Sequence, residues 1–197
     1  MKKIISLFLF LLTLSHFTYG QASTDKKATH GILFMSGGRY DNFRRCAATS
    51  AGTKGGPIAD IMYVTKYQLN NNHSISFNLP VFRPILFAIA FKMLQFEPEF
   101  TYQYNKAIND RIDFIAGPGA GISFHYGPDY KSKLRDLNNS FFAIGPFLSL
   151  NTGIAFKREG MVKSSVCLKA FYVPLFAKDR TTGTVLGGAL LYTIYFK

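Results

Sequence analysis

The sequence predicts an all-β protein, a single eight-stranded antiparallel up-and-down transmembrane β-barrel. Three features predict this fold: an N-terminus resembling a secretory signal, long stretches of alternating apolar and polar residues, and connections that alternate between long and short. The composition agrees, with 20 Phe, 11 Tyr and only 17% charged residues. Soluble domains carry about 25% charged residues, so the high aromatic content and the low fraction of charged residues both need a structural explanation.

The N-terminus has the parts of a secretory signal peptide. Lys2 and Lys3 precede the apolar run Ile4–Leu14, and small residues suited to cleavage follow. A run of this length is too short for a membrane-spanning helix, which needs about 20 residues. We therefore expect residues 1–22 to be cleaved and residues 23–197 to form a barrel domain in the bacterial outer membrane.

Apolar and polar residues alternate along most of the mature chain. Successive side chains of a strand point to opposite faces, so a two-residue period predicts strands rather than helices. About eight strands and no helix are expected. The expected strands are His30–Ser36, Ile58–Leu69, His73–Leu79, 96–104, 112–126, 142–156, 162–172 and Thr184–Lys197.

The aromatic surplus lies on one face of these stretches. That face includes Phe96, Phe100, Tyr102, Tyr104, Phe114, Phe124, Phe142 and Phe156. The opposite face is small, hydroxyl-bearing or charged, with Gly117, Gly119, Gly121 and Gly153 at its centre. Small residues suit the narrow interior of an eight-stranded barrel, so we expect the rings to face lipid. The alternative is a secreted soluble barrel that binds an apolar ligand, in which the two faces are exchanged.

The connections between the expected strands provide a separate test. Connections at 37–56, 80–93, 127–140 and 178–183 are expected at one end of the barrel and connections at 70–72, 105–110 and 158–160 at the other, so that long and short connections mostly alternate. Outer-membrane barrels have short periplasmic turns and longer outer loops, as this order predicts. Within one long connection, the apolar run Pro84–Phe91 is expected to be a strand end or an interfacial loop.

Together these features resemble the OmpA/OmpX-like class of small eight-stranded bacterial outer-membrane barrels. The resemblance covers nearly all of the mature chain and includes alternating C-terminal residues, Tyr192, Ile194 and Phe196. It implies recognition by the outer-membrane assembly machinery and a monomer. It also implies an interior filled by side chains, so a general porin function is not expected.

Charged residues on the inner face are expected to form a lumen charge network. Its expected members are Glu97, Glu99, Arg111, Asp113, Lys157, Lys163 and Lys169. These ions would have to pair, because an unpaired buried charge is costly.

The expected outer loops are basic and are candidates for contact with glycolipid phosphates. The residues expected to make these contacts are Arg39, Arg44, Arg45, Arg83, Lys131, Lys133, Arg135 and Arg180. Arginine forks suit phosphate groups. Export makes nucleic acid a poor partner for this basic chain, whose formal charge is +12, and outer-membrane lipid is the expected partner instead.

Catalysis has one weak pair of candidates, His125 and Ser123, which share a strand face. A polar lumen position explains both residues equally well. No cofactor or metal site is expected, and Cys46 and Cys167 are not expected to form a disulfide because the expected topology separates them. The expected function is a structural or surface-interaction role without catalysis, and a lipid-modifying barrel enzyme is the alternative.

Overall fold

The computed structural model describes residues 28–42, 55–91, 94–128, 140–178 and 182–196. These residues form nine strands and one helix. The strands are β1 (Thr29–Asp41), β2 (Gly56–Asn70), β3 (His73–Pro80), β4 (Leu94–Phe96), β5 (Glu99–Ala107), β6 (Ile112–Pro128), β7 (Ser140–Arg158), β8 (Met161–Ala177) and β9 (Thr182–Phe196), and the helix is α2 (Phe82–Phe91).

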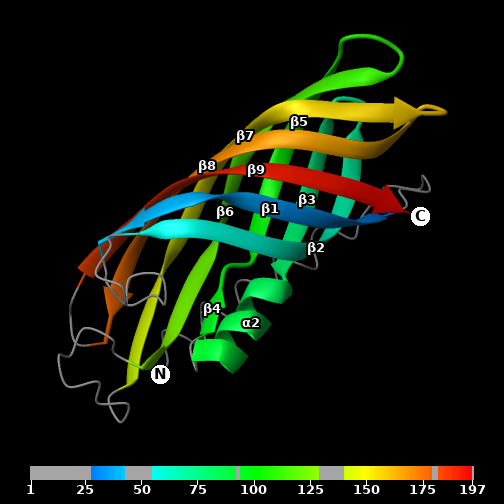
Figure 1. The fold of residues 1–197 in the computed structure, drawn as a ribbon. Helices are drawn as coiled ribbons and strands as arrows, with labels where there is room; N and C mark the ends of the chain where they lie inside the picture. Colours follow the sequence, from blue (N-terminus) through cyan, green and yellow to red (C-terminus); the bar gives the residue numbers. More distant parts are fainter. Residues whose placement is uncertain (1–27, 43–54, 92–93, 129–139, 179–181, 197) are drawn as a thin grey trace, which may run out of the picture.

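Eight strands close into an antiparallel ring in the order β1-β2-β3-β5-β6-β7-β8-β9, and β9 pairs back with β1 (Figure 1). The predicted eight-stranded up-and-down barrel is confirmed. The remaining strand, β4, precedes β5 along the chain and pairs with the same neighbour, β6. The expected strand 96–104 is therefore interrupted at Glu97 and Pro98, and proline lacks the N–H group that a strand ladder uses.

The two ends of the barrel differ. One end, called the turn end below, carries the turns at 71–72, 108–111 and 159–160 and the paired residues His30 and Phe196, where β1 begins and β9 ends. The opposite end, called the loop end, carries the connections 43–55, 129–139 and 178–181. Glu159 and Gly160 both have positive φ, 56° and 73°, as a two-residue hairpin turn requires.

Helix α2 contradicts the expectation of a strand end or loop over Pro84–Phe91. Strand β3 stops at Pro80, and beyond this point α2 packs against β2 and β4 in place of a wall strand (Figure 1). Its outer side is apolar, because Phe82, Ile85, Leu86 and Ile89 are all exposed. A short apolar run does not distinguish a helix from a buried strand, so the pattern missed it. No helix within the described residues is long and apolar enough to cross a membrane.

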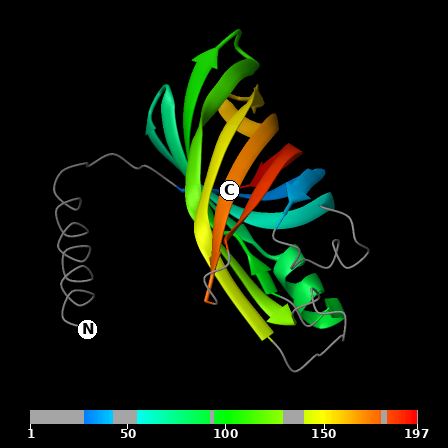
Figure 2. The same ribbon diagram turned by 90° about the vertical axis from the view of Figure 1, so that its left-hand side faces the viewer.

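The outer surface of the ring is aromatic and aliphatic. Near mid-height the exposed fractions are 60% for Phe100, 67% for Leu150 and 63% for Leu168. Exposed apolar residues also lie on β1, β2, β5, β6, β7, β8 and β9, whose arrangement around the barrel is shown in Figures 1 and 2. They are Phe34, Tyr63, Tyr104, Phe114, Ile122, Tyr126, Phe142, Ile154, Phe176, Leu186, Leu190 and Ile194. Rings on the outside match the surface of a membrane barrel and not the exchanged faces of a soluble one.

The lumen is lined by both apolar and polar side chains. On β7 and β8 the rings of Phe147 and Phe171 stack with centroids 5.5 Å apart, and Val173 and Val185 are fully buried. Buried polar or charged residues come from all nine strands and from α2. The candidate functional groups therefore lie on all sides of the lumen.

Candidate functional site

In the loop-end half of the lumen, Arg83 joins three parts of the wall. Its side chain comes from α2, and Nη2 donates to Glu97 Oε2 between β4 and β5. Its Nε lies 3.2 Å from Asp60 Oδ2 on β2. All three side chains are buried. Arg83 therefore links α2 to β2 and to the segment between β4 and β5. These are the parts of the wall on either side of the position beyond the end of β3.

Asp60 also holds the start of α2. Its Oδ1 accepts a hydrogen bond of 2.9 Å from the backbone N–H of Arg83. The first N–H groups of a helix have no partner within the helix, and a side-chain oxygen supplies one here. The capping residue, Asp60, lies on β2 and is distant in sequence from the start of α2, so no local sequence signature predicts this cap.

Ser123 and His125 are brought together with Glu97 in the same half of the lumen. His125 Nε2 lies 3.0 Å from Ser123 Oγ and 3.4 Å from Glu97 Oε1. Ser123 Oγ donates to Glu97 Oε1 at 2.9 Å. In a hydrolytic triad the serine and the carboxylate contact opposite ring nitrogens of the histidine, whereas here both contact the same one. The serine proton thus points to the carboxylate, and both side chains are buried.

Arg39 belongs to this cluster as well. Its Nη1 donates to Gln95 Oε1 at 3.2 Å, and its Nη2 lies 3.6 Å from Asp41 Oδ2. Arg39 and Arg83 were expected in outer loops as anion contacts, and that placement is wrong. β1 continues past the two glycines that break its alternation, and α2 turns Arg83 inward, so both side chains are buried in the lumen.

The middle of the lumen is filled by a second polar cluster around Glu99. Lys169 Nζ and Ser149 Oγ both donate to its carboxylate, and Asn78 Nδ2 donates to Glu99 Oε2 at 3.3 Å. Gly119 leaves room for this contact, because a Cβ there would lie 2.3 Å from Glu99 Oε1. We call Glu99, Lys169, Ser149 and Asn78 the central plug.

A small cavity lies next to the central plug. Its volume is about 20 Å³, and Asn78, Thr101, Asn151, Cys167 and Leu191 contribute to its lining. A cavity of this size holds about one water molecule. The cavity beside the central plug is therefore too small for a solute larger than water.

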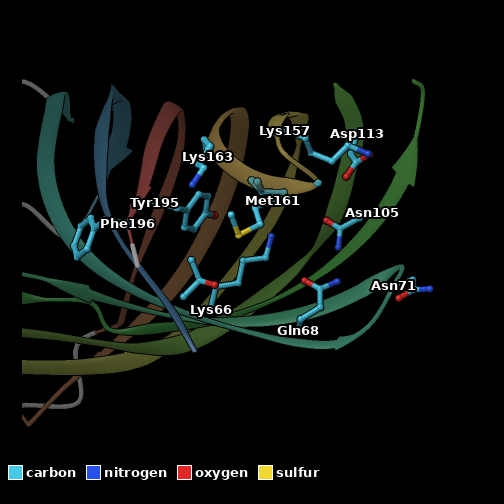
Figure 3. Close-up of a pocket in the computed structure, with 13 residues that line it drawn as sticks. Lys66, Gln68, Asn71, Asn105, Asp113, Lys157, Met161, Lys163, Tyr195 and Phe196 are labelled. Carbon is cyan, nitrogen blue, oxygen red and sulfur yellow. The ribbon is translucent and has the colours of Figure 1, made fainter. Parts of the chain in front are cut away.

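The turn end of the lumen opens into a cup of about 450 Å³, shown in Figure 3. Lys66 from β2 and Lys163 from β8 extend toward Tyr195. Lys157 instead pairs with Asp113, with Nζ and Oδ1 2.6 Å apart. We call this space the turn-end cup. Its lining is Thr29, Lys66, Gln68, Asn71, Asn105, Asp113, Lys157, Gly160, Met161, Val162, Lys163, Tyr195 and Phe196.

Most members of the expected lumen charge network do point inward, but they form separate groups. Glu97 lies with Arg39, Asp41, Asp60 and Arg83 in a group that we call the loop-end cluster. Glu99 and Lys169 belong to the central plug. Asp113, Lys157 and Lys163 line the turn-end cup. Arg111 is the exception, because it lies exposed in the turn between β5 and β6. There Asn109 Oδ1 accepts its backbone N–H at 2.9 Å.

The two charged lumen residues of β2, Asp60 and Lys66, were missed from the sequence. Both lie on the inward positions of β2, which alternate as Ile58, Asp60, Met62, Val64 and Lys66. The signal was therefore present, although apolar neighbours on the same face obscured it.

Several expected sites lie outside the described residues. They are Arg44, Arg45, Lys131, Lys133, Arg135, Arg180 and Cys46. Cys167 is free and buried in the lumen. Among the described residues, no group of His, Cys, Asp or Glu side chains could hold a metal ion.

No family model matches the chain, and no curated protein matches it in sequence. It is similar in structure to neisserial surface protein A, at 10% identity and TM-score 0.43, over 86% of this chain and 99% of that one. It is similar to Ail, the attachment invasion locus protein of Yersinia pestis, at 14% identity and TM-score 0.43, over 87% and 99%. A weaker likeness, at 9% identity and TM-score 0.32, covers 90% of this chain and 99% of the outer membrane protease OmpT from Escherichia coli.

Proposed function

We propose that this protein is a non-conducting outer-membrane barrel with a structural or surface-interaction role and without catalysis. The observation that carries the proposal is the central plug. Glu99 and Lys169 pair across the lumen, and the cavity beside them is about 20 Å³. A barrel sealed in this way fixes its loops at the membrane surface and does not pass solutes.

The loop end is the proposed outer face. Barrels of this kind place short turns and both chain ends in the periplasm, so the longer connections face outward. These connections carry Arg44, Arg45, Lys131, Lys133, Arg135 and Arg180. Their proposed partners are the phosphate groups of outer-leaflet glycolipid, which basic side chains bind as charge-assisted pairs.

The buried Ser123–His125–Glu97 group supports a structural role over the alternative of a lipid-modifying enzyme. Glu97 is engaged by Arg83 and Ser123 together. A nucleophile has to reach its substrate, whereas Ser123 has no exposed surface and faces the lumen rather than the lipid. These residues close the loop-end half of the lumen instead.

Planar-bilayer recording of the refolded mature chain, residues 23–197, tests the sealed lumen. The expected result is no conductance steps above the bare membrane. Stable channels whose number rises with the amount of protein would contradict the proposal. Replacing Glu99 and Lys169 together by Ala is the matched variant, because it removes the charged pair of the plug and should produce openings if the plug is the seal.

Vesicle binding tests the proposed surface interaction. Folded protein should retain glycolipid that carries phosphate groups better than the same glycolipid after phosphatase treatment. Changing Arg44, Arg45, Lys131, Lys133, Arg135 and Arg180 to Gln should abolish that preference. Equal retention of both lipids by the unmodified protein would reject phosphate recognition while leaving the sealed barrel intact.

A further inference from the structure

We propose that the turn-end cup binds a phosphate-bearing ligand of about the size of a sugar phosphate. The cup measures about 450 Å³, within the range of pockets that hold small molecules. It lies at the end of the barrel opposite the basic loops and is closed from them by the central plug. The proposal is therefore independent of the glycolipid contacts described above.

The charge of the cup favours an anion. Three lysines, Lys66, Lys157 and Lys163, line it against one aspartate, Asp113, which leaves a formal charge of +2. Lys157 already pairs with Asp113. The surplus therefore belongs to Lys66 and Lys163, and a phosphate monoester with up to two negative charges would balance it.

Lys66 is the residue that points most clearly to a ligand. It is only 6% exposed, and among the described residues no carboxylate lies within ion-pair distance of its ammonium group. Its contact in the structure is the ring of Tyr195, with Nζ 5.4 Å from the ring centroid. A largely buried lysine with no carboxylate at ion-pair distance is unfavourable, so an anion that entered the cup and contacted its ammonium group would bind favourably.

The arrangement leaves space for the rest of the ligand. Lys66 and Lys163 come from β2 and β8 and converge beside Tyr195, while Lys157 and Asp113 lie on the other side of the cup (Figure 3). A phosphate between the first two lysines would place its ester group toward Asn105 and Gln68, which also line the cup. Ring packing on Tyr195 and Met161 suits the apolar side of a sugar.

Calorimetric titration of the folded mature chain in detergent tests this site, with glucose 6-phosphate, inorganic phosphate and glucose as probes. Glucose 6-phosphate should bind, phosphate should bind more weakly, and glucose should not bind. A short-chain phosphatidic acid, titrated below its micelle concentration, distinguishes a lipid headgroup from a free sugar phosphate. Binding of none of the phosphate probes would overturn the proposal.

Variants identify the cup as the binding site. Lys66→Met should weaken binding of glucose 6-phosphate at least 10-fold, and Lys163→Gln should weaken it several-fold. Lys66→Arg keeps the charge and should retain binding, which separates loss of the ligand contact from loss of the fold. Lys106→Gln is the matched control, because Lys106 is exposed near the same end of β5. Unchanged binding in Lys66→Met would place the ligand elsewhere and reject the proposal.

Discussion

The two ends of the lumen use similar charged residues in opposite ways. At the loop end, Arg39 and Arg83 face Asp41, Asp60 and Glu97, and all five side chains are buried. At the turn end, three lysines face one aspartate in an open cup. The loop-end cluster has a carboxylate for each cation, whereas the cup has a surplus of positive charge. The comparison indicates that the first region holds the wall together and the second is prepared for an anion.

The difference follows from what each region must connect. Beyond the end of β3, toward the loop end, the wall lacks a strand. Side chains connect α2 to its neighbours there, and Arg83 contacts Asp60 on β2 and Glu97 next to β4. At the turn end the strand ladder is continuous from β6 through β9 to β1 and β2. Backbone hydrogen bonds are sufficient there, so the lumen lysines are not needed for the wall.

The largest effect is expected from Arg83→Met. This change leaves Asp60 and Glu97 buried without their cation, and breaking a buried ion pair in this way costs about 3–5 kcal/mol. Equilibrium urea unfolding of the barrel in lipid vesicles measures the loss. The triple variant Asp60→Asn, Arg83→Met, Glu97→Gln removes all three charges and should recover most of the stability. A loss below about 1 kcal/mol in the single variant would show that Arg83 does not hold the wall.

A much smaller effect on stability is expected from Lys66→Met. Lys66 has no ion-pair partner among the described residues, and its removal relieves the cost of keeping a largely buried positive charge. The free energy of unfolding should change by less than about 1 kcal/mol in the same urea experiment. A loss as large as that of Arg83→Met would erase the contrast between the two ends and make Lys66 part of the structural frame.

The sequence predicted the strands and their facing well, because alternation records directly which side chains meet lipid. Phe100 and Phe114 point outward and Glu99 and Lys169 inward, as the two-residue period requires. The pattern missed α2, since an unbroken apolar run carries no period that separates helix from strand. Its cap, Asp60, lies on a different strand, so only the folded chain brings the two together.

The candidate site was predicted less completely than the fold. Alternation assigned Lys157, Lys163 and Asp113 to the lumen but could not say which of them pair, because pairing depends on height along the barrel and on neighbouring strands. Arg39 was placed in a loop since Gly37 and Gly38 interrupt the apolar pattern. In the structure these two glycines still pair with β2 and β9, so the strand continues to Asp41.

Cysteine accessibility tests the contrast between the two ends most directly. In a Cys46→Ser, Cys167→Ser background, single cysteines replace Ser123 or Lys163, and the protein in nanodiscs is treated with a charged maleimide that reaches both ends. Lys163→Cys should be modified within minutes, whereas Ser123→Cys should stay unmodified until the barrel is unfolded. Equal rates at the two positions, or faster modification of Ser123→Cys, would contradict a lumen that is sealed at the loop end and open at the turn end.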